Sequence, residues 1–163
     1  MQRIAKFEKV SKEQFGKDTT NLGLQAAYED IVLPQRATTG SAGYDFYAPM
    51  DIVLKPGEEL TVSTGIRAKM QEGWVLMCCP RSGLGFKFRM QLNNTVGIID
   101  SDYYHAKNEG HIMARIFNDS RSDKVIEIKA GQAFVQGIFL PFGITEDDAA
   151  EGQREGGFGS TTK

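Results

Sequence analysis

Apolar and polar residues alternate with a period of two through much of the chain, the spacing that places one face of a β-strand in a core. Residues 59–70, ELTVSTGIRAKM, follow this alternation, and residues 74–79, WVLMCC, form a short apolar run. Turns containing glycine precede both segments, KPG at 55–57 and QEG at 71–73. Further strands are predicted at 30–34, 43–54, 111–118, 124–131 and 133–142. Many short strands with few helix-period segments predict an all-β fold, a jelly-roll-like β-barrel.

The two ends of the chain have a different pattern. Residues 1–20 predict a short helix, in which Ser11 is the N-cap and Gln14, three residues later, completes a capping-box sequence. From Thr145 onward the chain is acidic, small and rich in glycine, which predicts a mobile arm. We therefore expect an N-terminal helical extension at 1–24, a β domain at 25–144 and a flexible C-terminal arm at 145–163.

Composition narrows the class of protein. A chain of 163 residues with 40% hydrophobic and 25% charged residues fits one soluble domain with a single core. A net charge of −2 provides no general attraction to nucleic acid or to an anionic membrane, and we find no apolar run long enough to span a bilayer. Cys78 and Cys79 are adjacent and would point to opposite faces of a strand, which disfavours a disulfide or metal site. A reducing, cytoplasmic setting follows as an expectation.

The C-terminal sequence QREGGFGSTTK, residues 153–163, cannot build a core. One interpretation is a frayed polar terminus, which is common. The alternative is a lid, because glycine backbone can surround an anion, Arg and Ser add charge and hydrogen bonds, and Phe offers a flat face for stacking.

Two segments carry residues that a sheet does not require. In SAGYDFYAP, 41–49, Asp45 stands inside an aromatic strand, where Asp is uncommon. In PRSGLGFK, 80–87, a strand runs into a turn in which Arg81, Ser82 and Gly83 can form an anion cradle from a guanidinium, a hydroxyl and backbone N–H groups. A surface turn with a solvated Arg is the plainer interpretation of the second segment.

A third segment, NNTVGIIDSDYYHAKNEGH at 93–111, places Asp100 at the end of an apolar strand. A carboxylate in that position can act as a general base on a water molecule. A Ca²⁺ loop is excluded for DSD because the glycine and the downstream glutamate are not at the required spacing. Tyr103 can stack on a sugar or base, although an aromatic residue at a strand end often only packs.

Taken in order, these segments resemble the five motifs of the trimeric dUTPase family, the deoxyuridine triphosphate nucleotidohydrolases. The motifs are AGYDF at 42–46, PRSGLG at 80–85, GIIDSDY at 97–103, GQAFVQG at 131–137 and REGGFGST at 154–161. Their shared order and spacing is much more specific than any one motif.

The resemblance implies a β jelly roll that assembles as a homotrimer with shared active sites and hydrolyses dUTP to dUMP and pyrophosphate. It implies Asp100 as the general base, Tyr103 as the ring that packs on deoxyribose, and Asn94, Gly97 and Ile98 as the hairpin that reads uracil. It further implies phosphate contacts from Arg81, Ser82, Gly83 and Gln136, and a water-mediated Mg²⁺ contact from Asp45. The closing arm would use Phe158 to stack on uracil and Arg154, Gly159 and Ser160 on the γ-phosphate.

Three other functions remain open from the sequence. A dCTP deaminase resembles this fold and its second motif, but it needs a glutamate proton shuttle where this chain has Asp100. A nucleotide-binding regulator without catalysis would bind dUTP and not turn it over. A structural jelly roll would leave Arg81, Ser82 and the glycine-rich tail unexplained.

Overall fold

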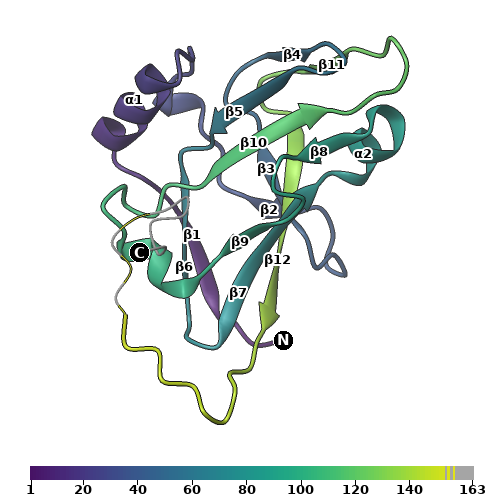
Figure 1. Cartoon of the computed structure of the whole chain (residues 1–163). Helices are drawn as coiled ribbons and strands as arrows, with labels where there is room; N and C mark the ends of the chain where they lie inside the picture. Colours follow the sequence, from purple (N-terminus) through teal and green to yellow (C-terminus); the bar gives the residue numbers. More distant parts are fainter. Residues whose placement is uncertain (153, 155, 157–163) are drawn as a thin grey trace.

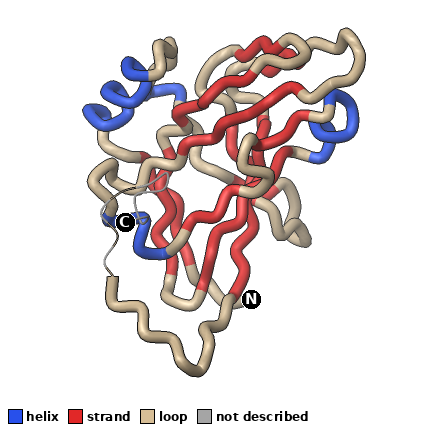
Figure 2. The backbone as a smooth tube through the Cα atoms, in the orientation of Figure 1, coloured by secondary structure: helices blue, strands red, loops and turns tan. Residues whose placement is uncertain are grey.

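Antiparallel strands in four sheets form the framework of the molecule, which confirms the all-β prediction (Figures 1 and 2). This computed structural model describes residues 1–152, 154 and 156. The sheets have the strand orders β2-β3-β12-β7-β9, β5-β10-β8, β1-β6 and β11-β4. Within the described residues the strands are β1 Ala5–Lys9, β2 Gln35–Arg36, β3 Tyr44–Tyr47, β4 Ile52–Leu54, β5 Glu59–Ser63, β6 Ile66–Met70, β7 Trp74–Pro80, β8 Met90–Leu92, β9 Gly97–Ile99, β10 Met113–Asn118, β11 Ile126–Ile128 and β12 Ala133–Pro141.

The five-stranded sheet carries most of the predicted site. Strand β12 lies at its centre, between β3 on one edge and β7 on the other, and β9 pairs with the far edge of β7. The register of β12 against β3 shifts between Ala133 and Val135. Such a bulge interrupts the alternation of faces, and Phe134 and Val135 are both buried, at 0% and 2% exposure.

The N-terminal segment differs from the predicted helix in its first half. Residues Ala5–Lys9 form strand β1, which pairs antiparallel with β6, so the charged residues of this segment alternate across a strand rather than around a helix. Phe7 explains why the strand is held there, since its ring lies 5.3–5.5 Å from those of Tyr44, Phe46 and Phe139. Strand β1 therefore covers aromatic residues of the five-stranded sheet.

The second half of that segment is the predicted helix, α1 Lys12–Asn21. The Ser11 side chain accepts a hydrogen bond from the Gln14 N–H, so the predicted N-cap is confirmed. The reciprocal half of a capping box comes from elsewhere, because Gln14 donates to Asp18 and the Ser11 N–H is taken by the distant Glu109 carboxylate. The Glu109 carboxylate thus accepts the Ser11 N–H hydrogen bond that a capping box would assign to Gln14.

Three further segments are short helices. The strand predicted at 30–34 is wrong: the 3₁₀ helix η1 Tyr28–Asp30 ends there and an irregular stretch leads to β2. The apolar run contains Pro34, which donates no hydrogen bond to a ladder. After β7 the chain forms α2 Ser82–Phe88, and after β9 it forms the 3₁₀ helix η2 Ser101–His105.

The core lies between the sheets and is built from aliphatic and aromatic side chains of every layer. Its fully buried large side chains include Phe15, Phe46, Phe134, Ile52, Ile66, Leu76, Met90, Ile116, Ile126 and Ile128. The predicted opposite orientation of the two cysteines agrees with the structure, since Cys78 is buried and Cys79 is partly exposed, and both are free thiols. Burial raises the pKa of the Cys78 thiol to about 12, which makes it unreactive at neutral pH.

Gly110 permits the closest backbone approach in the loop after η2. It has φ +71°, and a Cβ there would lie 2.6 Å from the Tyr103 carbonyl oxygen and 2.7 Å from the Tyr104 Cα. Gly57 has a similar φ of +84° but open space where its Cβ would be. A substitution at Gly57 therefore tests only the cost of a left-handed backbone, whereas one at Gly110 adds the cost of a collision with backbone atoms.

We expect Gly110→Ala to lower the free energy of unfolding by roughly 3 kcal/mol or more, since left-handed strain and overpacking act together. Gly57→Ala should cost only about 1–2 kcal/mol, the cost of the left-handed backbone. Urea denaturation of both variants at one protein concentration measures the difference. Equal losses would show that the loop moves away from η2 without cost.

Candidate active site

Two groups of predicted site residues lie at opposite ends of strand β7. The first group joins three neighbouring strands. Asp45 on β3 pairs in register with Gln136 on β12, and Gln136 pairs with Cys79 on β7, two residues before Arg81. The structure therefore brings together Asp45, Arg81 and Gln136, to which the family resemblance assigned phosphate or Mg²⁺ contacts.

An ion pair organises this first group. Arg81, the N-cap of α2, donates through Nη1 to Oδ2 of Asp45, whose side chain is only 13% exposed. A buried carboxylate beside a guanidinium holds the guanidinium in one orientation. Ser82 and Gly83 follow in the exposed first turn of α2, where helical N–H groups lack intrahelical partners. Together these residues form a concentrated set of hydrogen-bond donors suited to phosphate oxygens.

Gln136 completes the group. Its Nε2 donates to the Pro80 carbonyl at 3.3 Å, which turns the side chain toward the start of the Arg81 turn. A Cβ on Gly43 would lie 2.8 Å from Gln136 Oε1, so the glycine allows β3 to approach this amide. The glycine of the AGYDF motif therefore has a steric role that the sequence analysis did not assign.

The hairpin that contains Asn94 is split between two sheets. Within the described residues, β8 pairs with β10 and β9 pairs with β7. The two arms of the hairpin do not pair with each other. Two strands that diverge leave their facing backbone edges open to a third partner. The turn between them includes Thr95 at φ +69° and hydrogen bonds from Thr95 N to Leu92 O and from Val96 N to Asn94 O, both 2.8 Å.

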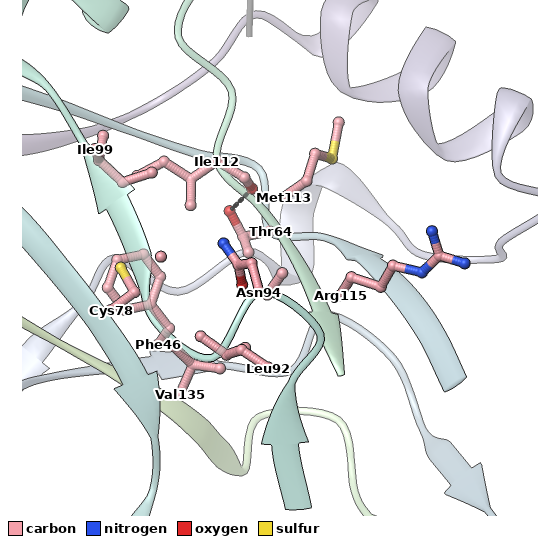
Figure 3. A pocket seen from close by; sticks show the side chains of 12 residues that line it. Phe46, Thr64, Cys78, Leu92, Asn94, Ile99, Ile112, Met113, Arg115 and Val135 are labelled. Atoms are coloured by element: carbon pink, nitrogen blue, oxygen red, sulfur yellow. Dashed lines mark hydrogen bonds between the residues drawn. The ribbon is translucent and has the colours of Figure 1, made fainter. Parts of the chain in front are cut away.

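A pocket opens beside this hairpin (Figure 3). Gly97 and Ile99 of β9 line it, whereas Ile98 between them is 56% exposed on the opposite face, as alternation along a strand requires. Figure 3 shows the Asn94 amide among the lining side chains. The complete lining consists of Phe46, Thr64, Cys78, Leu92, Asn94, Gly97, Ile99, Ile112, Met113, Ala114, Arg115 and Val135. The hollow is mostly apolar with a few polar groups.

Asp100 directly follows β9 and is the N-cap residue of η2. Its side chain is 46% exposed, and Arg154 of the C-terminal segment donates from Nη2 to Asp100 Oδ2 and from Nε to Asp102 Oδ1, the latter at 2.8 Å. The Arg154 guanidinium also lies 5.8 Å from the centre of the Tyr103 ring. The predicted base, the predicted sugar-contacting ring and one residue of the predicted arm are therefore neighbours.

Tyr103 is 6% exposed and held by its hydroxyl group. The hydroxyl donates to the His111 carbonyl at 2.8 Å and accepts from Asn108 Nδ2 at 2.8 Å. Burial is the main cause that raises the pKa of Tyr103, so the group is a neutral phenol at pH 7. The sequence analysis missed Asn108 and His111 as supports, because nothing local in the sequence marks them as partners of Tyr103.

The register of β7 separates the two groups. Ile99 pairs with Leu76, so Asp100 lies level with Val75, while Arg81 follows Pro80 at the other end of the strand. At about 3.3 Å of rise per residue, Asp100 and Arg81 are about 20 Å apart. One triphosphate cannot reach both ends of this strand within one chain.

Phe158, Gly159 and Ser160, the other predicted arm residues, lie outside the described residues. In the part of the chain that the structure describes, no cluster of three or more His, Cys, Asp or Glu side chains could hold a metal ion. The described residues also contain no helix with both the length and the apolar character needed to cross a membrane.

Comparison with curated proteins gives relatives of one kind. A deoxyuridine 5'-triphosphate nucleotidohydrolase of Lactococcus lactis is 42% identical over 134 residues, covering 80% of this chain and 88% of the relative. An enzyme of the same name from Psychromonas ingrahamii is 37% identical over 143 residues, covering 83% of this chain and 90% of the relative.

Solved structures agree on the fold. A dUTPase from Streptococcus mutans superposes with a TM-score of 0.67 at 35% identity, covering 86% of this chain and 98% of that one. The dUTPase of Staphylococcus bacteriophage 80alpha, solved with dUpNHpp, shares the fold at 21% identity and a TM-score of 0.67, covering 98% of this chain and 99% of that one. Residues 29–162 match the dUTPase family model, and with these relatives and the jelly-roll β fold they show that this chain belongs to the dUTPase family.

Proposed function

We propose that this chain, a dUTP diphosphatase by family, hydrolyses dUTP to dUMP and pyrophosphate in active sites shared between three identical subunits. The separation of Asp100 from Arg81 along β7 is the observation that supports shared sites. A second copy can bring its Arg81 group to the Asp100 of the first, and rotational symmetry then repeats the same contact around a closed ring. The product dUMP would supply thymidylate synthesis, and removal of dUTP would keep uracil out of DNA. The free cysteines fit a reducing cytoplasm.

In this mechanism the split hairpin binds the base and Tyr103 packs on the sugar. Open backbone edges near Gly97 and the Asn94 amide provide donors and acceptors for the edge of uracil. The Tyr103 ring, fixed by two hydrogen bonds at its hydroxyl, leaves a rigid face toward deoxyribose. A rigid face excludes an added 2′-hydroxyl more strongly than a mobile one, because it cannot move aside at low cost.

Asp100 would accept a proton from the water that attacks the α-phosphorus, and the bond from that phosphorus to the oxygen bridging to the β-phosphorus would break. Arg81, Ser82, Gly83 and Gln136 would hold the phosphate oxygens, and positioning with charge stabilisation supplies most of the catalysis in phosphoryl transfer. Arg154 pairs with Asp100 in this structure, so a bound triphosphate would compete for its guanidinium and release the base.

Mg²⁺ is the cofactor that the family resemblance implies, and a dUTPase of Staphylococcus aureus phage phi11 is described with a structural Mg(II) ion. The donor set here fits an ion carried mainly by phosphates, since Asp45 offers a hard carboxylate oxygen and is already paired with Arg81. Bound Mg²⁺ would supply charge neutralisation of the phosphate oxygens.

The substrate range tests the proposed reaction. We expect rapid pyrophosphate release from dUTP with Mg²⁺, and little from dTTP, dCTP or UTP, because the hairpin reads uracil and Tyr103 excludes ribose. Ammonia release from dCTP would instead indicate a deaminase. Tight dUTP binding without pyrophosphate would indicate a regulator.

Asp100→Asn tests the general base. Asparagine keeps the shape and cannot accept the proton, so kcat should fall by a factor of about 100 or more while the nucleotide still binds. Single-turnover pyrophosphate release and calorimetric binding of a non-hydrolysable analogue measure the two effects separately. Full turnover in the variant would remove Asp100 from this role.

A further inference from the structure

The residues before the family match make contacts that the reaction does not explain. The dUTPase model matches residues 29–162, so β1 and α1 lie outside it. Three polar links join this N-terminal segment to the loop 104–111, which follows Tyr103. Tyr104 Oη donates to Glu8 at 2.5 Å, Ser11 donates twice to Glu109 at 2.7 Å, and Asp18 contacts the His111 ring at 2.6 Å.

The contact between Asp18 and His111 has a defined proton arrangement. The Gly65 N–H donates to His111 Nε2 at 2.8 Å, so Nε2 is the acceptor and Nδ1 carries the hydrogen that is donated to Asp18. The His111 ring is fully buried, and burial is the main cause that lowers its pKa, which keeps it neutral. A neutral, doubly hydrogen-bonded ring fixes the position of its own backbone carbonyl, which is the acceptor for Tyr103.

Asp18, His111 and Ser63 resemble a nucleophilic triad only in composition. Ser63 Oγ lies 3.5 Å from Nε2, at the limit for a hydrogen bond, and the Gly65 N–H already occupies that nitrogen. Ser63 is fully buried and shares a hydrogen bond with Thr19 at 3.2 Å, which also belongs to α1. These contacts hold α1 against β5 and leave no path for a substrate, so the cluster is a structural link.

The loop 104–111 in turn holds Tyr103. His111 and Asn108 bond its hydroxyl, Asn108 Oδ1 accepts from Gly110 N at 3.2 Å, and Gly110 packs against the Tyr103 carbonyl. From the opposite side, the Arg67 guanidinium lies 3.6 Å from the centre of the Tyr104 ring and donates to the Tyr104 carbonyl at 2.6 Å. A continuous set of contacts thus runs from β1 and α1 to the ring that would face the sugar.

We propose that the N-terminal segment, residues 5–19, positions Tyr103 through the loop 104–111 and thereby sets the discrimination between deoxyribose and ribose. The residues that carry this role are Glu8, Ser11 and Asp18, which are positioning residues because they act through the loop. The inference rests on the proposed contact of Tyr103 with the sugar.

The test is the ratio of kcat/KM for dUTP to that for UTP. Asp18→Ala removes the acceptor from His111 Nδ1 and should lower the ratio about tenfold, since small displacements of positioning groups change rates by one to two orders of magnitude. Asp18→Asn retains an acceptor oxygen and should restore most of the ratio. Glu109→Gln provides a second route to the same loop if Asp18→Ala does not fold.

Two controls separate positioning from general stability. Gly57→Ala strains the backbone in open space far along the chain, and Glu29→Ala breaks the exposed pair with Lys12 on the same N-terminal segment. Both should leave the ratio unchanged. If Asp18→Ala and Glu109→Gln lower only the melting temperature, in parallel with Gly57→Ala, the segment is a stabilising brace and the proposal fails.

The variant Tyr103→Ala distinguishes two reasons for a negative result: the N-terminal segment does not position Tyr103, or Tyr103 does not contact the sugar. If Tyr103→Ala changes the ratio and the Asp18 and Glu109 variants do not, the N-terminal segment does not position Tyr103 and the role of Tyr103 stands. If Tyr103→Ala leaves the ratio unchanged, the sugar contact is wrong and the proposal fails with it. Absence of dUTP hydrolysis by the wild-type protein would contradict the proposed function itself.

Discussion

Strand β7 sets the geometry on which the rest of the structure depends. Hydrogen bonds on one edge align it with β12 and, through β12, with β3, while its other edge aligns β9. These ladders place Arg81, Asp45 and Gln136 at one end and Asp100 at the other, about 20 Å away at the rise of an extended strand. A strand buried in a sheet cannot shorten, which is why we propose that residues from another copy of the chain complete the nucleotide site. Under that proposal, assembly is required for the chemistry.

The hairpin and the N-terminal segment both shape the proposed site through contacts with neighbouring elements. The arms of the hairpin form hydrogen bonds with β10 and β7 rather than with each other, and a mostly apolar pocket with Asn94 in its lining lies beside them. Strand β1 and helix α1 lie outside the family match, yet their contacts meet at the loop that supports Tyr103. Rigid support matters most for a group that discriminates by exclusion, because such a group works only if it does not yield.

Local patterns in the sequence predicted most strands and the Ser11 cap. The family resemblance implied phosphate or Mg²⁺ roles for Asp45, Arg81 and Gln136, and the structure brings these residues together. The patterns give the wrong element at β1, where the charged residues of a strand are typical of a helix, and at 30–34, where an apolar run ends in Pro34. Hydrogen-bond partners far apart in the sequence could not be predicted: Ser11 and Glu109 are 98 positions apart, and Asp18 and His111 are 93 positions apart. No periodicity encodes such pairs, since they depend on how finished layers pack. The separation of about 20 Å between Asp100 and Arg81 could not be predicted either, because it follows from the register of β7 with its neighbouring strands.

The most direct test of the divided site is complementation between two inactive variants. Asp100→Asn and Arg81→Gln chains, each carrying a different tag, would be co-expressed and the mixed oligomers isolated by sequential affinity steps. If each site takes Asp100 and Arg81 from different subunits, one site in three of every mixed trimer holds both native residues, and dUTP hydrolysis returns to about a third of the wild-type rate. Activity no greater than that of the two variants measured separately would show that both residues act within one chain, and would contradict the account.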